Sequence, residues 1–173
     1  GFYRPLELLY TRRIGKVLPD GNEVPLVVGT KAFGRAGDWE YGGFYSVTAE
    51  TDYMDGLEAK SEPRASFVSA RVKKSVFDNS TIGVLFAAKS TREGGNGVVD
   101  IDGALRTSDW QLAYQIARSF NGPQGDFAGS ACFKSNGKDF IFATRVRAVG
   151  TDFDISQVGF VPWRGTLDIV GLA

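Results

Sequence analysis

Two carboxylates at alternate positions, Asp100 and Asp102, are the first residues of this chain whose spacing could do chemistry. Side chains two apart in an extended strand point to the same face, so this pair could share a proton or bind a cation. Basic residues recur with the same spacing in two other runs: Arg71 and Lys73, then Arg145 and Arg147. We expect these opposite charges to face one another inside a β-protein, because ion pairs hold neighbouring strands in register.

The chain lacks the residues that most catalytic and metal sites need. Histidine is absent, which removes the commonest general base and metal ligand. The single cysteine, Cys132, cannot form an internal disulfide, and its position inside an alternating run predicts a buried thiol, or one in a barrel wall, rather than a nucleophile. We therefore expect no catalytic residues, no metal site and no cofactor.

Three other segments could bind a ligand, and each has a simpler structural interpretation. The pair Arg12 and Arg13 could hold an anionic group or anchor a loop through salt bridges. The glycine-rich residues 29–37 lack the spacing and the following helix of a phosphate-binding loop, so we expect these glycines to relieve crowding at a bend. Residues 93–97 are acidic and glycine-rich, which predicts a solvated loop tip, with a weak Ca²⁺ contact as the alternative.

β-strands are the elements that must hold these side chains. From Val24 onward, runs of about ten residues alternate apolar and polar side chains, which is typical of strands with two different faces. We expect strands at residues 24–33, 39–51, 65–76, 81–89, 98–106, 110–120, 127–134, 140–148 and 165–172. Leu6, Leu8 and Tyr10 also keep a period of two, which permits one more strand within residues 1–14.

The connections between these runs alternate in length. Short turns fall at residues 34–38, 78–80, 107–109 and 135–138, and longer connections fall at residues 52–63, 91–96, 121–125 and 152–163. A meander with tight turns at one end and longer loops at the other is the plan of an outer-membrane barrel. The predicted fold class is therefore all-β: an antiparallel up-and-down meander of roughly nine or ten strands, forming an outer-membrane β-barrel or a fragment of one.

Length and composition limit the classes of protein that remain. The 173 residues suit a single domain, residues 1–173, and a formal net charge of zero gives no reason to expect nucleic acid as a partner. Glycine at 22 residues and aromatics at 13% fit a β-protein rich in turns. The chain starts at Gly1 without a signal peptide, and residues 167–173 stop within an alternating run, so we expect a fragment of a longer chain.

The alternation alone does not say which face of the strands is inside. Three features favour a membrane barrel over a soluble one: opposite charges at mid-strand, apolar faces that mix large aromatics with alanine and glycine, and aromatics near strand starts. The aromatics expected at the membrane interface are Trp39, Tyr41, Trp110 and Phe127. The alternative is a soluble all-β carbohydrate-binding module, in which Trp39, Tyr41 and Tyr45 form a platform that stacks on sugars.

Five segments carry a resemblance to a known family. They are Tyr-Thr-Arg-Arg-Ile-Gly at residues 10–15, Pro-Leu-Val-Val-Gly-Thr-Lys-Ala-Phe-Gly-Arg-Ala-Gly-Asp-Trp at 25–39, Ala-Arg-Val-Lys-Lys-Ser-Val at 70–76, Ser-Thr-Ile-Gly-Val-Leu-Phe at 80–86 and Val-Gly-Phe-Val-Pro-Trp at 158–163. In that order they resemble a bacterial family of unknown function, in which a family-9-like carbohydrate-binding domain precedes a large outer-membrane-type barrel. The resemblance covers nearly the whole chain.

The resemblance implies that this chain corresponds to the early part of that barrel. The family's binding domain is missing, so no sugar-binding residue carries over, and no catalytic motif does either, although some members are labelled hydrolases. The expected function is the wall of a pore, or of a pathway for solutes or polymers, in the bacterial outer membrane. The six charged residues named first would line its lumen. The expected partners are membrane lipid, glycan or another small solute, and the missing parts of the same polypeptide.

Overall fold

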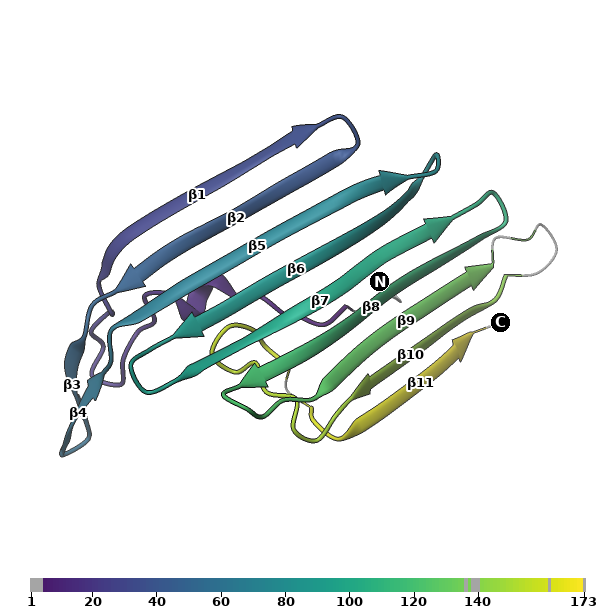
Figure 1. Cartoon of the computed structure of the whole chain (residues 1–173). Helices are drawn as coiled ribbons and strands as arrows, with labels where there is room; N and C mark the ends of the chain where they lie inside the picture. Colours follow the sequence, from purple (N-terminus) through teal and green to yellow (C-terminus); the bar gives the residue numbers. More distant parts are fainter. Residues whose placement is uncertain (1–4, 136, 138–140, 162, 173) are drawn as a thin grey trace.

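The computed structural model describes residues 5–135, 137, 141–161 and 163–172, and antiparallel strands make up most of it (Figure 1). Nine strands form one sheet in the order β1-β2-β5-β6-β7-β8-β9-β10-β11. Their bounds are β1 Leu26–Ala36, β2 Trp39–Thr48, β5 Ala65–Val76, β6 Ser80–Ser90, β7 Gly95–Arg106, β8 Trp110–Asn121, β9 Phe127–Ser135, β10 Ala143–Val149 and β11 Thr166–Leu172. The predicted all-β antiparallel meander is confirmed. No helix in the described part of the chain is long and apolar enough to cross a membrane.

The strands follow the alternating runs of the sequence, and the differences fall in the connections. The expected loop at residues 52–63 contains a separate hairpin of β3 (Thr51–Asp55) and β4 (Glu58–Glu62), which extends beyond the end of the sheet (Figure 1). The strand permitted within residues 1–14 is wrong for residues 5–14, which form a short 3₁₀ turn, η1 (Thr11–Arg13), and one isolated bridge. Phe140, expected at the start of a strand, lies outside the described residues.

Most of the exposed large apolar side chains of the sheet lie on one face, here called the outer face. A row of four crosses β5 to β8 in register, and its members are between 42% and 58% exposed: Val72, Val84, Ile101 and Ile116. Successive side chains of a strand point to opposite faces, so their neighbours in sequence form a row on the other, inner face. That row is covered, and three of its members are 8% exposed or less: Leu85, Asp100 and Ala117.

Two segments cover part of the inner face and are here called the cap: residues 5–25, and residues 150–161 with 163–165 (Figure 1). A backbone bridge between Glu7 and Phe160 joins them, and the Tyr10 N–H donates to the Val158 carbonyl at 2.7 Å. Apolar side chains of both segments pack on small and branched residues of the sheet: Leu6, Leu8, Phe153, Ile155 and Val158 on Leu85, Ala87, Val98, Ala117, Ala128 and Val149. The hydrophobic core therefore lies between the cap and the inner face.

Three glycines of the outer face lie directly opposite an aromatic residue of the next strand. The pairs are Gly34–Tyr41, Gly97–Phe120 and Gly103–Tyr114. A Cβ at each of these glycines would come within 2.8 Å of the facing aromatic side chain, so no larger residue fits without a shift of that ring. The glycines thus make room for aromatic packing across strands rather than for a turn.

The sheet is open, and its two edge strands run in the same direction. Within the described residues, β1 pairs only with β2, and β11 pairs only with β10. Every neighbouring pair is antiparallel, so the first and the ninth strand of the meander are parallel to each other (Figure 1). Direct pairing of β1 with β11 would create one parallel pair. Closure with antiparallel pairing throughout therefore requires an odd number of additional strands.

Candidate functional site

All six charged residues that the spacing singled out lie on the inner face. Arg71 and Lys73 come from β5, Asp100 and Asp102 from β7, and Arg145 and Arg147 from β10. Strand β10 is separated from β7 by β8 and β9, whereas only β6 separates β5 from β7. The sheet therefore brings the carboxylates close to the basic residues of β5 and keeps them away from those of β10.

Arg71 and Asp102 form an ion pair that reaches across β6. The Nη2 atom of Arg71 lies 2.6 Å from Oδ1 of Asp102. Gly83 of β6 lies between the two, and a Cβ at this position would be 3.3 Å from both atoms. Glycine thus leaves open the space through which the two side chains meet. This contact agrees with the expectation that opposite charges meet on the polar face.

The other basic residues of the inner face have different neighbours. Lys73 Nζ lies 2.6 Å from Glu40 Oε2 of β2, and Arg145 Nη2 lies 2.9 Å from Asp168 Oδ2 of β11. Arg147 is half-buried and forms no ion pair within the described part of the chain. Sequence reasoning did not assign either acidic partner, because the spacing within one strand does not reveal the register with the next.

Asp100 is fully buried beneath the cap. Gln115 Nε2 donates to Asp100 Oδ2 at 3.3 Å, while Gln115 Oε1 accepts the Leu6 N–H at 2.7 Å. Asp100 Oδ1 and Asp102 Oδ2 are also buried, and neither has a hydrogen-bond partner among the described residues. Gln115, which the sequence did not single out, therefore links a carboxylate of the sheet to the backbone of the cap.

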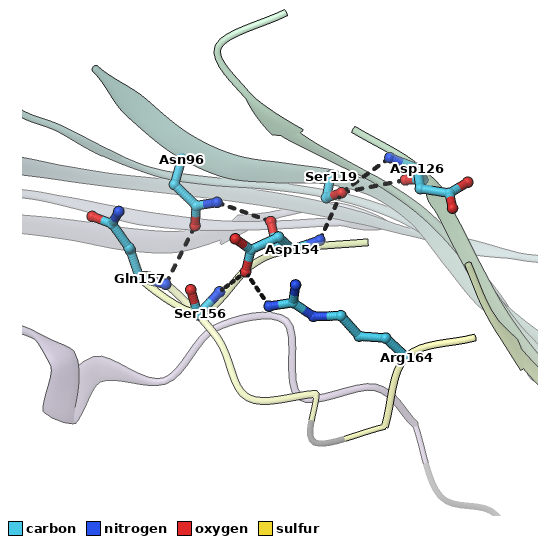
Figure 2. Close-up of polar contacts among 7 residues, drawn as sticks. All are labelled: Asn96, Ser119, Asp126, Asp154, Ser156, Gln157 and Arg164. Carbon is cyan, nitrogen blue, oxygen red and sulfur yellow. Dashed lines mark hydrogen bonds and ion pairs between the residues drawn. The ribbon is translucent and has the colours of Figure 1, made fainter. Parts of the chain in front are cut away.

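Two buried polar side chains of the sheet, Asn96 and Ser119, hold the second cap segment (Figure 2). Asn96 Nδ2 donates to the Asp154 carbonyl at 2.9 Å, and Asn96 Oδ1 accepts the Gln157 N–H at 3.3 Å. Ser119 Oγ accepts the backbone N–H of Asp154 at 3.1 Å and that of Asp126 at 3.2 Å. Asn96 and Ser119 are at most 1% exposed, so these bonds fix the cap backbone away from water.

The carboxylate of Asp154 organises the cap segment itself. Its Oδ1 atom accepts the Ser156 N–H at 3.0 Å and lies 2.6 Å from Arg164 Nη2 (Figure 2). The described residues of the stretch 152–163 contain no strand, as expected. The hydrogen bonds nevertheless tie this loop to the sheet, so it is an ordered part of the inner side.

The four aromatics expected at a membrane interface all lie on the outer face. Trp39, Tyr41 and Phe127 are about half-exposed, and Trp110 stacks on Phe133 with ring centroids 6.2 Å apart. Trp39, Tyr41 and Trp110 lie toward the end of the sheet that carries the tight turns, while Phe127 lies at the end with the longer loops. Aromatic side chains therefore occur near both ends of the apolar face.

The remaining chemistry of the described residues is sparse. Cys132 is a free, buried thiol on the inner face, in agreement with the expectation. Among the residues that the structure describes, no three acidic or cysteine side chains lie close enough together to hold a metal ion. Comparison with protein-family models, with curated proteins and with solved structures finds no match to this chain.

Proposed function

We propose that this sheet is part of the wall of a bacterial outer-membrane β-barrel, with its outer face toward lipid and its inner face toward a polar interior. One observation carries the proposal: most of the exposed large apolar side chains are on the uncovered outer face, while the inner face, which carries the charged residues, is the one that packs on the cap through small and branched apolar residues. An antiparallel sheet in water normally packs its more apolar face on the core and leaves the polar face solvated. Here the face with most of the large apolar side chains is the uncovered one.

The extent of the apolar surface supports lipid as the neighbour. Soluble monomers rarely expose a large contiguous apolar patch, and such a patch marks a surface that contacts something else. Here every strand from β2 to β11 in the sheet contributes an exposed apolar or aromatic residue: Tyr45, Val68, Val84, Ile101, Ile116, Phe127, Val146 and Ile169. A protein partner would cover a limited patch, whereas lipid surrounds a barrel wall along its whole width.

The inner face and the connections support the same proposal. Porin-type barrels have a polar interior, and strands that alternate apolar-out and polar-in. The ion pair of Arg71 with Asp102 and that of Arg145 with Asp168 lie on the inner face, and the cap would occupy part of the interior. The family resemblance described above agrees with a barrel of this kind.

A closed barrel needs strands besides the nine of this sheet. Each edge strand pairs with only one other strand among the described residues, and the two edge strands run parallel to each other. Bacterial single-chain barrels have an even number of antiparallel strands. We therefore propose that an odd number of further strands of the same polypeptide lies between β11 and β1.

The membrane proposal is tested on the longer polypeptide that includes the proposed further strands, by refolding it into detergent micelles and running it on a gel with and without boiling. We expect the unboiled sample to migrate differently from the boiled one, because a closed barrel with a lipid-facing surface resists the gel detergent until it is heated. A parallel sample in plain buffer is expected to aggregate through its apolar face. A folded, soluble protein in plain buffer would contradict the proposal.

Passage of solutes along the inner face predicts an effect of Arg147 on ion selectivity. Of the four basic residues, Arg147 alone has no ion pair in the described part of the chain, so its charge is the least neutralised of the four. Arg147→Glu should shift the reversal potential in planar bilayers toward cation selectivity, because charges that line a lumen tune what passes. Arg118→Glu, on the outer face, is the matched control. Unchanged ion selectivity in the Arg147→Glu variant would show that Arg147 does not line the pathway.

A soluble carbohydrate-binding module is the second candidate, and the aromatic side chains of β2 favour it. Trp39, Tyr41 and Tyr45 alternate along this strand, so all three lie on the outer face, and each is about half-exposed. Rings in such a row could stack on successive sugars of a polysaccharide. Polysaccharide binding in plain buffer, lost in Trp39→Ala and kept in Trp163→Ala, would favour this function over the barrel.

A further inference from the structure

A polar cavity of about 390 Å³ opens between the cap and the sheet, at the end with the longer loops. Several separate parts of the chain line it, including the 3₁₀ turn, the ends of β4, β6 and β8, and the second cap segment. Pockets for small molecules span about 300–1,000 Å³, so this volume suits a ligand the size of one sugar. None of the six charged residues of the inner face described above lines this cavity.

Basic side chains outnumber acidic ones in the lining of this cavity. Glu62 forms salt bridges with two lysines. Lys16 Nζ lies 2.8 Å from one carboxylate oxygen, and Lys89 Nζ lies 3.2 Å from the other. Burial opposes ionisation of Glu62, but the two ammonium groups outweigh it and keep the pKa of this carboxyl below its ordinary value. The cluster therefore retains one excess positive charge at neutral pH. Glu93, the second acidic residue of the lining, is exposed on its loop.

Arg13 adds a further positive charge to the lining and forms no ion pair in the described part of the chain, so with Glu93 included the lining keeps one net positive charge. The backbone N–H of Arg13 donates to the Tyr10 carbonyl at 3.1 Å, and this bond holds the Arg13 backbone at the end of η1. The Nε atom of Arg13 is buried and has no hydrogen-bond partner among the described residues. A buried donor of a charged group is costly to leave unpaired, and a planar guanidinium suits a carboxylate, which can accept two parallel hydrogen bonds. Arg13 also lines the cavity, so a carboxylate there can pair with its guanidinium through the terminal nitrogens.

Uncommitted polar side chains in the same lining suit a ligand with hydroxyl groups. Asn121, Ser156 and Gln157 make no side-chain hydrogen bond within the described part of the chain, although the backbones of Ser156 and Gln157 are held (Figure 2). No aromatic ring of a described residue lines the cavity, so these residues offer no stacking surface for the apolar face of a neutral sugar.

We propose that this cavity binds a small polyhydroxylated carboxylate of the sugar-acid type, with Arg13 holding the carboxylate and the polar side chains holding hydroxyl groups. This proposal rests on the proposed pathway function in one respect only: it assumes that the bound solute is one that passes through the barrel. Binding itself depends on the cap and the sheet ends, and it is measured without a membrane.

Titration calorimetry of the refolded longer polypeptide in detergent micelles at neutral pH tests this site with three probes: glucuronate, glucose and acetate. We expect glucuronate to bind more than about tenfold tighter than either of the others, because only it offers both a carboxylate and hydroxyl groups. Arg13→Gln should weaken glucuronate by about tenfold or more. Arg12→Gln is the matched control, because Arg12 is exposed and does not line the cavity.

A second variant, Gln157→Ala, keeps the backbone bond to Asn96 and should weaken glucuronate binding severalfold, with circular dichroism to confirm folding of each variant. Equal affinity for glucose or acetate, or unchanged affinity in Arg13→Gln, would overturn the proposal. If the polypeptide shows the heat-dependent gel shift but does not bind glucuronate, the proposed sugar-acid site is contradicted and the barrel proposal stands. If it binds glucuronate and also folds in plain buffer, the site is supported and the barrel proposal is contradicted.

Discussion

The variant Ile101→Arg is expected to lose about 2–4 kcal/mol of unfolding free energy in phospholipid vesicles. Ile101 lies near the middle of β7 on the outer face, in register between Val84 and Ile116. If lipid contacts this face, the guanidinium enters the hydrocarbon near the depth where a charge is most costly. In water the same side chain would reach solvent, and the change would stay within about 0.5 kcal/mol. Denaturant titration followed by tryptophan fluorescence measures the free energy of unfolding of the variant and of the unchanged protein.

Two companion variants make the result on Ile101 decisive. Ile116→Arg changes the residue directly opposite and should show a loss of similar size. Leu57 lies in the turn of the β3–β4 hairpin, where its side chain is fully exposed. The variant Leu57→Arg should therefore leave the free energy of unfolding unchanged. Losses below about 1 kcal/mol in both isoleucine variants would contradict a lipid-facing surface and favour the soluble carbohydrate-binding module.

Phe153→Ala is expected to destabilise the protein by about 3–5 kcal/mol. Phe153 is 1% exposed and packs in the core between the cap and the inner face, with Leu8, Ile155 and Val158. Removing its ring leaves a cavity that the hydrogen-bonded sheet cannot collapse to fill. Because the cap consists of loop segments, we expect it to detach before the sheet unfolds. Limited proteolysis within residues 150–165 reports that detachment.

Phe160→Ala is the matched control for Phe153. It lies in the same cap segment, but its side chain is about half-exposed, and its bridge to Glu7 uses only backbone atoms. The expected loss is about 1 kcal/mol or less, with little change in cleavage. Equal protease resistance of both variants and the unchanged chain would show that the core around Phe153 does not hold the cap.

Most strands could be predicted from the sequence because their alternation is a local property. Within the predicted strand at residues 81–89, Ile82, Val84, Phe86 and Ala88 occupy alternate positions, and all four lie on the outer face of β6. Charged residues two apart share the inner face for the same geometric reason. The order of strands followed as well, because short connections leave consecutive strands little choice but to pair with each other.

The acidic partners of Lys73 and Arg145, the polar side chains that bind the cap, and the cap itself could not be predicted. Leu6 and Leu8 keep the period of a strand, yet they lie in the cap, because their side chains pack on Ala87 and Ala117 of the inner face. Isolated polar residues such as Gln115 carry no pattern in the sequence. Its bond to Leu6 joins residues separated by 109 positions, and only the folded chain brings them together.

The sequence by itself therefore determined an antiparallel sheet with one apolar and one charged face, because side chains alternate along any extended strand. It could not determine which face is covered, since alternation is the same for a sheet that packs its apolar side inward and for one that turns it outward. The tertiary structure decided this point through the cap, whose two segments pack on the inner face, which also carries the charged residues, and leave most of the large apolar side chains of the outer face uncovered.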